Sequence, residues 1–163
     1  MIFRDEFASG KAGDLRQDKH VLVCHGGSDP HGLTEFSLQA LALVDRHITI
    51  TVLITDSFPA PAEIERFAKA SPHSCAVVRN AKAIRGYMES ASVAVINGGN
   101  VRYELCLCGT PYIAVSFQET QYDCTEQLSR QGVGMNLGLI TAVTPKAVAN
   151  AVTDLIDDQK KEK

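Results

Sequence analysis

The sequence has no long apolar run, no basic stripe and no basic leader, and each absence excludes a class of protein. No stretch approaches the roughly 18 apolar residues that span a membrane, and the first residues, MIFRDE, lack the basic start of a signal peptide. The formal net charge is −3, and no segment concentrates lysine and arginine. We therefore expect a cytoplasmic protein with no membrane span and no nucleic acid partner.

The cysteines follow neither a disulfide framework nor a metal-binding pattern. Their number, five, is odd, and Cys24 and Cys106 lie in apolar segments, which is typical of reduced structural thiols. Cys106 and Cys108 are two residues apart, and such positions point to different faces of a helix. We expect no metal site and no cofactor.

The length of 163 residues suits one domain with a full core. We predict a polar lead, a remnant of an interdomain linker, over residues 1–19, one ligand-binding domain over residues 20–159 and a charged tail over residues 160–163.

Apolar runs and helical spacings alternate along the chain. They predict six strands and six helices, with strands at 20–25, 48–54, 75–79, 92–96, 111–117 and 134–139, and helices at 32–46, 61–70, 81–90, 101–108, 120–131 and 145–158. This alternation predicts an α/β fold with a Rossmann-like, doubly wound, six-stranded parallel sheet. Ligands of such sheets bind where the strand order reverses, and we expect the first and fourth strands to be neighbours there.

Those two strands are each followed by a glycine-rich turn, Gly26-Gly27 after the first and Gly98-Gly99 after the fourth. Paired glycines let the backbone approach a ligand closely. The helix that follows each turn directs unpaired N–H groups and a positive dipole end toward an anion. Two such turns in one small domain predict a cleft for a diphosphate, such as that of a nucleotide sugar.

The common phosphate motifs do not fit the first turn. The dinucleotide fingerprint G-x-G-x-x-G is absent there. Gly27, Gly32 and Thr34 have the spacing of a P-loop, but Leu33 stands where its lysine must be. A small P-loop-like or dinucleotide enzyme stays as an alternative that would require binding of ATP or NAD.

Four short motifs, in one order, resemble the nucleotide-sugar hydrolases of pseudaminic acid biosynthesis and the related spore coat polysaccharide proteins. They cover nearly the whole chain and lie at Phe3–Phe7, Gly26–Pro30, Asn97–Cys106 and Pro111–Gln121. These hydrolases have the two-domain GT-B architecture, and the chain is similar to its C-terminal half, the glycosyltransferase family 28 C-terminal domain.

The resemblance implies that the chain holds the UDP part of a UDP-sugar. In the family, the N-terminal domain carries a histidine thought to activate the attacking water, and that histidine has no counterpart here. We therefore predict no catalytic residue in this chain and little turnover without a separate N-terminal catalytic domain. The chain is either an excised domain or a naturally short homologue, and the sequence leaves both interpretations open.

The resemblance also assigns roles to individual residues. The Gly26-Gly27 turn with Ser28, and the Gly98-Gly99 turn with Asn100, would bind the diphosphate. Glu104 would accept hydrogen bonds from both ribose hydroxyls. The remaining predicted contacts are Asn80, Ala81 and Ile84 for uracil, and Gln121, beside Glu119, for the sugar or phosphates.

Several residues keep two interpretations. Asp29 is better explained as a helix cap than as a catalytic group, and His25 and His31 either touch the ligand or are structural. Asn100-Val101 replaces the Ser-Thr pair usual in the family, and Thr120 replaces its usual asparagine. Arg102 could offset the lost hydroxyls with its charge.

Two further functions stay open beside UDP-sugar hydrolysis. One is the donor-binding half of a GT-B glycosyltransferase, which uses the same cleft. The other is a stand-alone nucleotide-sugar-binding or interaction module.

Overall fold

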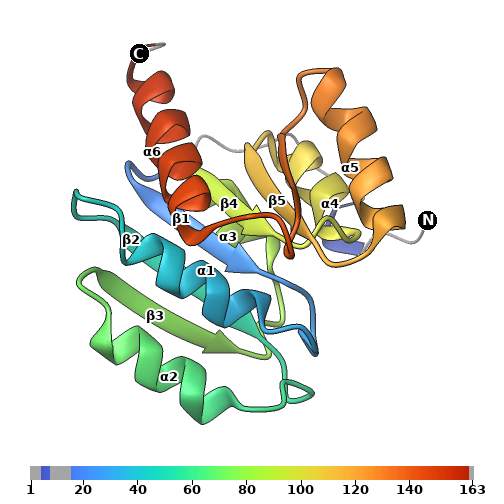
Figure 1. The fold of residues 1–163 in the computed structure, drawn as a ribbon. Helices are drawn as coiled ribbons and strands as arrows, with labels where there is room; N and C mark the ends of the chain where they lie inside the picture. The colour runs from blue at the N-terminus through green and yellow to red at the C-terminus, as the bar shows by residue number, and fades with distance from the viewer. Residues whose placement is uncertain (1–4, 8–15, 162–163) are drawn as a thin grey trace.

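The computed structural model describes residues 5–7 and 16–161. Its centre is one sheet of six parallel strands in the order β3-β2-β1-β4-β5-β6 (Figure 1). The strands are β1 (His20–Cys24), β2 (Thr49–Ile54), β3 (Ser74–Arg79), β4 (Val93–Ile96), β5 (Tyr112–Ser116) and β6 (Met135–Leu139). The chain winds outward in both directions from β1 and β4. The predicted Rossmann-like, doubly wound sheet and the neighbouring first and fourth strands are confirmed.

The helices are α1 (Leu33–Leu41), α2 (Pro61–Ala70), α3 (Arg85–Ser90), α4 (Val101–Cys108), α5 (Glu119–Arg130) and α6 (Pro145–Lys161). Three helix bounds differ from the prediction by more than one residue. Helix α1 ends five residues early, because the N–H groups of Leu43 and Val44 bond three residues back and tighten the chain into a turn. Helix α6 continues past the expected Asp158, and α3 begins only at Arg85.

The late start of α3 has a backbone cause. Asn80 has a left-handed φ of 51°, which ends β3 in a turn rather than leading directly into a helix. The segment from Asn80 to Ile84 therefore stays irregular and lies at the carboxyl edge of the sheet.

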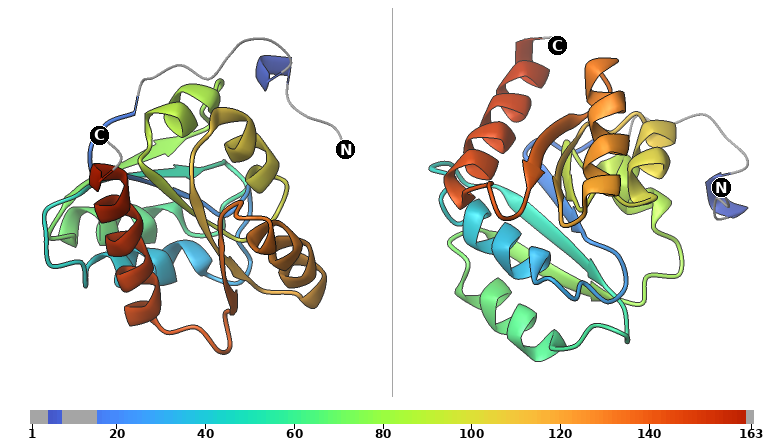
Figure 2. Two further views of the ribbon diagram at one scale, coloured as in Figure 1. Left: turned by 90° about the horizontal axis from the view of Figure 1, so that it is seen from above. Right: turned by 45° about the vertical axis from the view of Figure 1, so that its right-hand side comes forward.

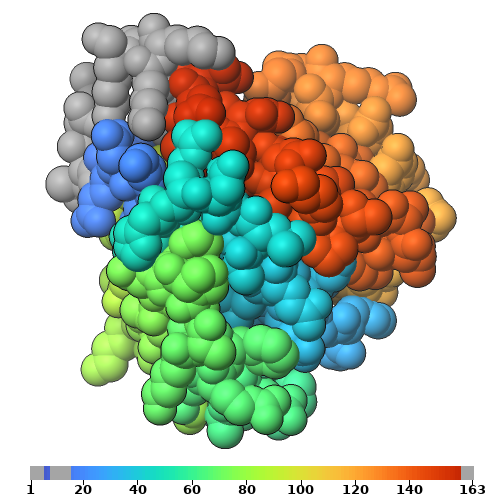
Figure 3. Space-filling view, turned by 60° about the vertical axis from the view of Figure 1, so that its left-hand side comes forward, coloured from blue at the N-terminus to red at the C-terminus, as the bar shows by residue number. Residues whose placement is uncertain are grey.

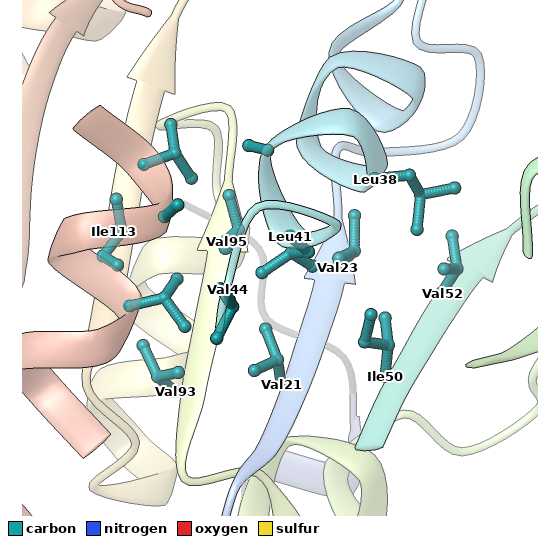
Figure 4. Close-up of a cluster of buried hydrophobic side chains, with 14 of the residues drawn as sticks. Val21, Val23, Leu38, Leu41, Val44, Ile50, Val52, Val93, Val95 and Ile113 are labelled. Carbon is teal, nitrogen blue, oxygen red and sulfur yellow. The ribbon is translucent and has the colours of Figure 1, made fainter. Parts of the chain in front are cut away.

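Alternate residues of each central strand pack on opposite faces of the sheet. Val21 and Val23 of β1 belong to the core beneath α1 and α6, whereas Leu22 and Cys24 belong to the core on the other side. Figure 4 shows the first of these cores, with side chains from four strands packed against Leu38 and Leu41 of α1. Both faces are buried, as the unbroken apolar runs predict.

The helices form the two outer layers. Helix α1 packs against α2 and α6 on one face (Figure 2), and in Figure 3 the red α6 lies alongside the blue-cyan α1. Helices α3 and α4 pack against each other near β1 and β4, and α5 packs on β5 and β6. Gly109, with a φ of 65°, caps the C-terminus of α4.

Part of the polar lead contacts the domain. Asp5–Phe7 forms a short 3-10 helix, and Phe7 is buried in the core on the α3 and α4 side. The Glu6 carboxylate accepts hydrogen bonds from the N–H groups of Ile84 (3.1 Å) and Arg85 (3.2 Å). Residues 1–4, 8–15 and 162–163, including Phe3 and Arg4 of the first motif, lie outside the described residues.

Within the described ranges, no helix is both long enough and apolar enough to cross a membrane.

Candidate functional site

The two glycine turns lie side by side at the carboxyl edge of the sheet, because Cys24 at the end of β1 pairs with Ile96 at the end of β4. Asn97 joins them. Its Nδ2 donates to the His25 carbonyl at 2.8 Å, and its Oδ1 accepts from the Gly99 N–H at 3.0 Å. The sequence-based prediction missed Asn97, although an amide directly before paired glycines is a usable signal for such a bridge.

The first turn presents a row of free donors. In the described part of the chain, no acceptor bonds the N–H groups of Gly26, Gly27 or Ser28. Gly26 has a φ of 86°, which favours glycine. The Thr55 hydroxyl donates to the Gly27 carbonyl at 2.7 Å and so fixes the turn against the end of β2.

Asp29 uses the donors at the start of α1 that we expected to face an anion. Its carboxylate, 5% exposed, accepts from the N–H groups of Leu33 (3.0 Å) and Thr34 (2.6 Å). The interpretation of Asp29 as a helix cap is confirmed, because its carboxylate binds the first N–H groups of α1, which begins at Leu33. The expectation of unpaired N–H groups is therefore wrong for the first turn of α1, because a carboxylate from the chain itself already binds them.

The second turn packs against Ser116 and Thr125. Gly98 is buried with a φ of 74°, and a Cβ there would lie 2.7 Å from Thr125 Oγ1 and 2.9 Å from Ser116 Oγ. The N–H of Gly99 is bound to Asn97, whereas the N–H of the exposed Asn100 meets no acceptor among the described residues.

A cavity of about 120 Å³ opens beside the first turn. Its polar lining includes Thr55, Asn80 and Lys82, and its apolar lining is Cys24, Leu53, Ile54, Ala81, Ile84 and Val101. Gly26 and Gly27 complete the wall. The structure thus brings five predicted site residues, Gly26, Gly27, Asn80, Ala81 and Ile84, into one cavity. Thr55, Lys82 and Val101 were not predicted as contacts; no motif in the sequence marks Thr55 or Lys82, whereas Val101 lies within the Asn97–Cys106 motif.

Other predicted residues lie outside this lining. Ser28 is exposed on the first turn. Glu104 is 5% exposed and lies in the first turn of α4, one helical turn beyond Val101. Gln121 is half-buried, and its Oε1 accepts from the Phe117 N–H at 3.3 Å.

The two histidines of the first turn differ in environment. His25 is 2% exposed, its Nε2 lies 2.8 Å from Ser37 Oγ, and burial lowers its pKa to about 4 despite the nearby Asp29. It is a neutral, structural group at pH 7. His31 is exposed and stacks on Phe117 with ring centroids 4.2 Å apart, which joins the first turn to the loop after β5.

The cysteines are free thiols, and no group of three metal-ligating side chains occurs in the described part of the chain. Cys24 and Cys108 are buried, and burial raises the pKa of Cys108 to about 11. Cys106 is exposed on α4 despite its apolar sequence neighbours, because the helix turns it away from the sheet.

No family model matches the chain, but two curated proteins do. Uncharacterized protein MJ1062 of Methanocaldococcus jannaschii is 26% identical over 131 residues, which are 76% of this chain and 27% of that protein. Spore coat polysaccharide biosynthesis protein SpsG of Bacillus subtilis is 27% identical over 128 residues, which are 77% of this chain and 38% of that protein. The chain spans less than half the length of either relative.

Among solved structures, Acinetobacter baumannii MurG matches with a TM-score of 0.73 at 14% identity, over 95% of this chain and 44% of that one. The glycotransferase of kitacinnamycin matches with a TM-score of 0.68 at 20% identity, over 98% and 40%. Glycosyltransferase VinC, solved with dTDP, matches with a TM-score of 0.60 at 15% identity, over 97% and 37%. The chain is a distant homologue of SpsG, and it has the fold of the C-terminal half of GT-B glycosyltransferases such as MurG.

Proposed function

We propose that the cavity and the first glycine turn bind a nucleoside diphosphate, the nucleotide part of a nucleotide sugar. The observation that carries the proposal is the row of free N–H groups at Gly26, Gly27 and Ser28, beside a cavity of about 120 Å³. Free backbone donors in a glycine turn suit phosphate oxygens. The cavity is smaller than the ~300–1,000 Å³ of pockets that enclose a whole ligand, but a cavity of ~150 Å³ holds one aromatic ring. It therefore suits a base, with the diphosphate outside.

The chemistry of the lining supports this division. Ile84 and Val101 offer apolar contact to the faces of a ring, and the side chains of Asn80 and Lys82 offer polar groups at its edge. The ribose would lie between the cavity and the turn, where Glu104 is the proposed acceptor for its hydroxyls. Ser28 and Asn100 would bind the phosphates, and Gln121 the sugar.

We further propose that the nucleotide is UDP and that the reaction is hydrolysis of a UDP-sugar in polysaccharide biosynthesis. The sequence motifs support the hydrolase, and the name of the relative SpsG, a spore coat polysaccharide biosynthesis protein, supports the pathway class. The matched share of the relatives supports a second domain or a separate partner that completes the reaction. The alternative is the donor half of a glycosyltransferase. The structural likeness to glycosyltransferases, one solved with dTDP, favours that alternative.

The first test is a thermal-shift titration with UDP, dTDP, ADP, GDP, CDP and NAD. A ligand at 100 times its Kd that binds only the folded state adds roughly 2.7 kcal/mol, which raises the Tm of a domain of this size by roughly 5–10 °C. We expect UDP to give the largest shift. Equal shifts with all nucleotides, or none, would contradict a base-specific site.

A variant of Glu104 tests the ribose part of the proposed site. The variant E104A should bind UDP about 10- to 100-fold more weakly, because hydrogen bonds to a charged group contribute about 1.5–3 kcal/mol. The wild-type protein should prefer UDP to 2′,3′-dideoxy-UDP, and E104A should lose this preference. A preference that survives in E104A would remove Glu104 from the ribose site.

A further inference from the structure

Arg102 is a buried cation with no ion-pair partner. Arg102 is 6% exposed, and no carboxylate of the described residues forms an ion pair with its guanidinium. Its Nη1 donates to the carbonyls of Gly98 and Gly99, the latter at 3.0 Å, and its Nη2 donates to the Tyr103 hydroxyl at 2.9 Å. Its Cζ lies 4.3 Å from the centre of the Tyr103 ring, and its buried Nε has no partner.

All of these contacts are with neutral groups. They satisfy most of the guanidinium donors but leave its positive charge uncompensated. Burial of a charge is costly, and buried charges in proteins are normally paired. An uncompensated cation against a surface turn therefore favours an anion that arrives from outside the chain.

The bonds of Arg102 also orient the second turn. In a trans peptide the C=O and the following N–H point in opposite directions, and the structure has no cis peptide in its described part. The carbonyls of Gly98 and Gly99 are turned toward Arg102, so the N–H groups of Gly99 and Asn100 point away from it. The Asn100 N–H is the one left without an acceptor among the described residues.

We propose that Arg102 is a positioning residue for the anionic part of the ligand, resting on the nucleoside diphosphate site proposed above. It turns the Asn100 N–H outward and supplies positive charge behind the second turn, without touching the ligand. This role accounts for a second turn that enters α4 through Asn100 and Val101, neither of which offers a hydroxyl to a phosphate.

The test compares R102Q and R102K with the wild-type protein, using inorganic pyrophosphate, UDP and uridine as probes in NMR titrations. A unit charge within several ångströms of a partly buried anion is worth about tenfold or more in affinity. We expect R102Q to weaken pyrophosphate and UDP by about that factor and to leave uridine unchanged. The control R130Q removes the same charge from an exposed, ion-paired arginine on α5 and should change none of the three.

The outcomes separate the charge of Arg102 from its structural contacts. Equal weakening of UDP and uridine in R102Q, or unchanged UDP binding, would overturn the proposal. If R102Q does not fold, R102K decides, because lysine keeps the charge but loses the forked geometry of the guanidinium. R102K should keep the UDP-to-uridine affinity ratio within about threefold of wild type, since the Coulomb contribution is retained, and loss of that ratio would contradict the charge role.

The wild-type result distinguishes this inference from the proposed function. Wild-type protein that binds pyrophosphate as tightly as UDP has an anion site but no nucleotide site, so the proposed function fails while the role of Arg102 is still decided by its variants. Wild-type protein that binds neither probe overturns both.

Discussion

His25 is a histidine that the fold keeps neutral. It is buried between the first turn and α1, and burial lowers its pKa from 6.5 to about 4. Above pH 6.5 both the folded and the unfolded chain hold it uncharged, so it imposes no penalty on folding. Between pH 6.5 and pH 4 the unfolded chain binds the proton more readily, and the free energy of unfolding falls as the pH falls.

The variant H25Q should remove this dependence. Between pH 7 and pH 4, we expect the titration of His25 to lower the free energy of unfolding of the wild-type protein by up to roughly 3 kcal/mol. The variant H25Q lacks this contribution, so its free energy of unfolding should fall by that much less over the same pH range. Urea unfolding at pH 7.0, 6.0, 5.0 and 4.0 measures this difference, with H31Q as the control at an exposed histidine. Parallel pH profiles for wild type and H25Q would show that His25 titrates normally.

At the scale of secondary-structure elements, the second turn is held by β5 and α5. Gly98 allows the turn to lie against Ser116 at the end of β5 and Thr125 in α5, with no room for a side chain. Gly32, directly before α1, has no comparable packing, and a Cβ there would meet nothing within 4 Å. Both glycines have similar left-handed φ values, 74° and 68°.

This similarity makes G98A and G32A a matched pair. G32A should lower the free energy of unfolding by about 1 kcal/mol, the cost of a left-handed backbone for alanine. G98A should cost a further 1–3 kcal/mol or so, because its Cβ overlaps two hydroxyl oxygens. Denaturant unfolding of both variants measures the difference. Equal losses would mean that the second turn is not packed as described.

At the scale of the whole molecule, local sequence patterns determined most of the architecture. The alternation of apolar runs and helical spacings predicted all six strands within about two residues, and the topology rule for parallel sheets placed β1 beside β4. The structure also brings the Asn80–Ile84 segment, which the resemblance assigned to the base, to the same cavity as Gly26 and Gly27.

The interactions that tune the site could not be predicted from the sequence. Asp29 binds the start of α1, and Glu6 binds the start of α3, because each carboxylate folds back onto donors that a motif would assign to a ligand. Arg102 is buried because α4 turns its side chain toward the protein interior. In a helix as short as α4, the sequence pattern indicates only weakly which face a single arginine occupies. Propensity and spacing describe local structure, whereas these contacts are set by tertiary packing.

The central claim is that a nucleoside diphosphate binds at the carboxyl edge of the sheet. The most direct measurement is an NMR titration of the ¹⁵N-labelled protein with UDP, which reports every backbone amide at once. The amides of Gly26, Gly27, Ser28 and Ala81 should shift together and saturate. A81W should abolish the shifts by filling the cavity, whereas A83W, at an exposed position on the same loop, should preserve them. Shifts confined to another edge of the sheet, or binding unchanged in A81W, would contradict the claim.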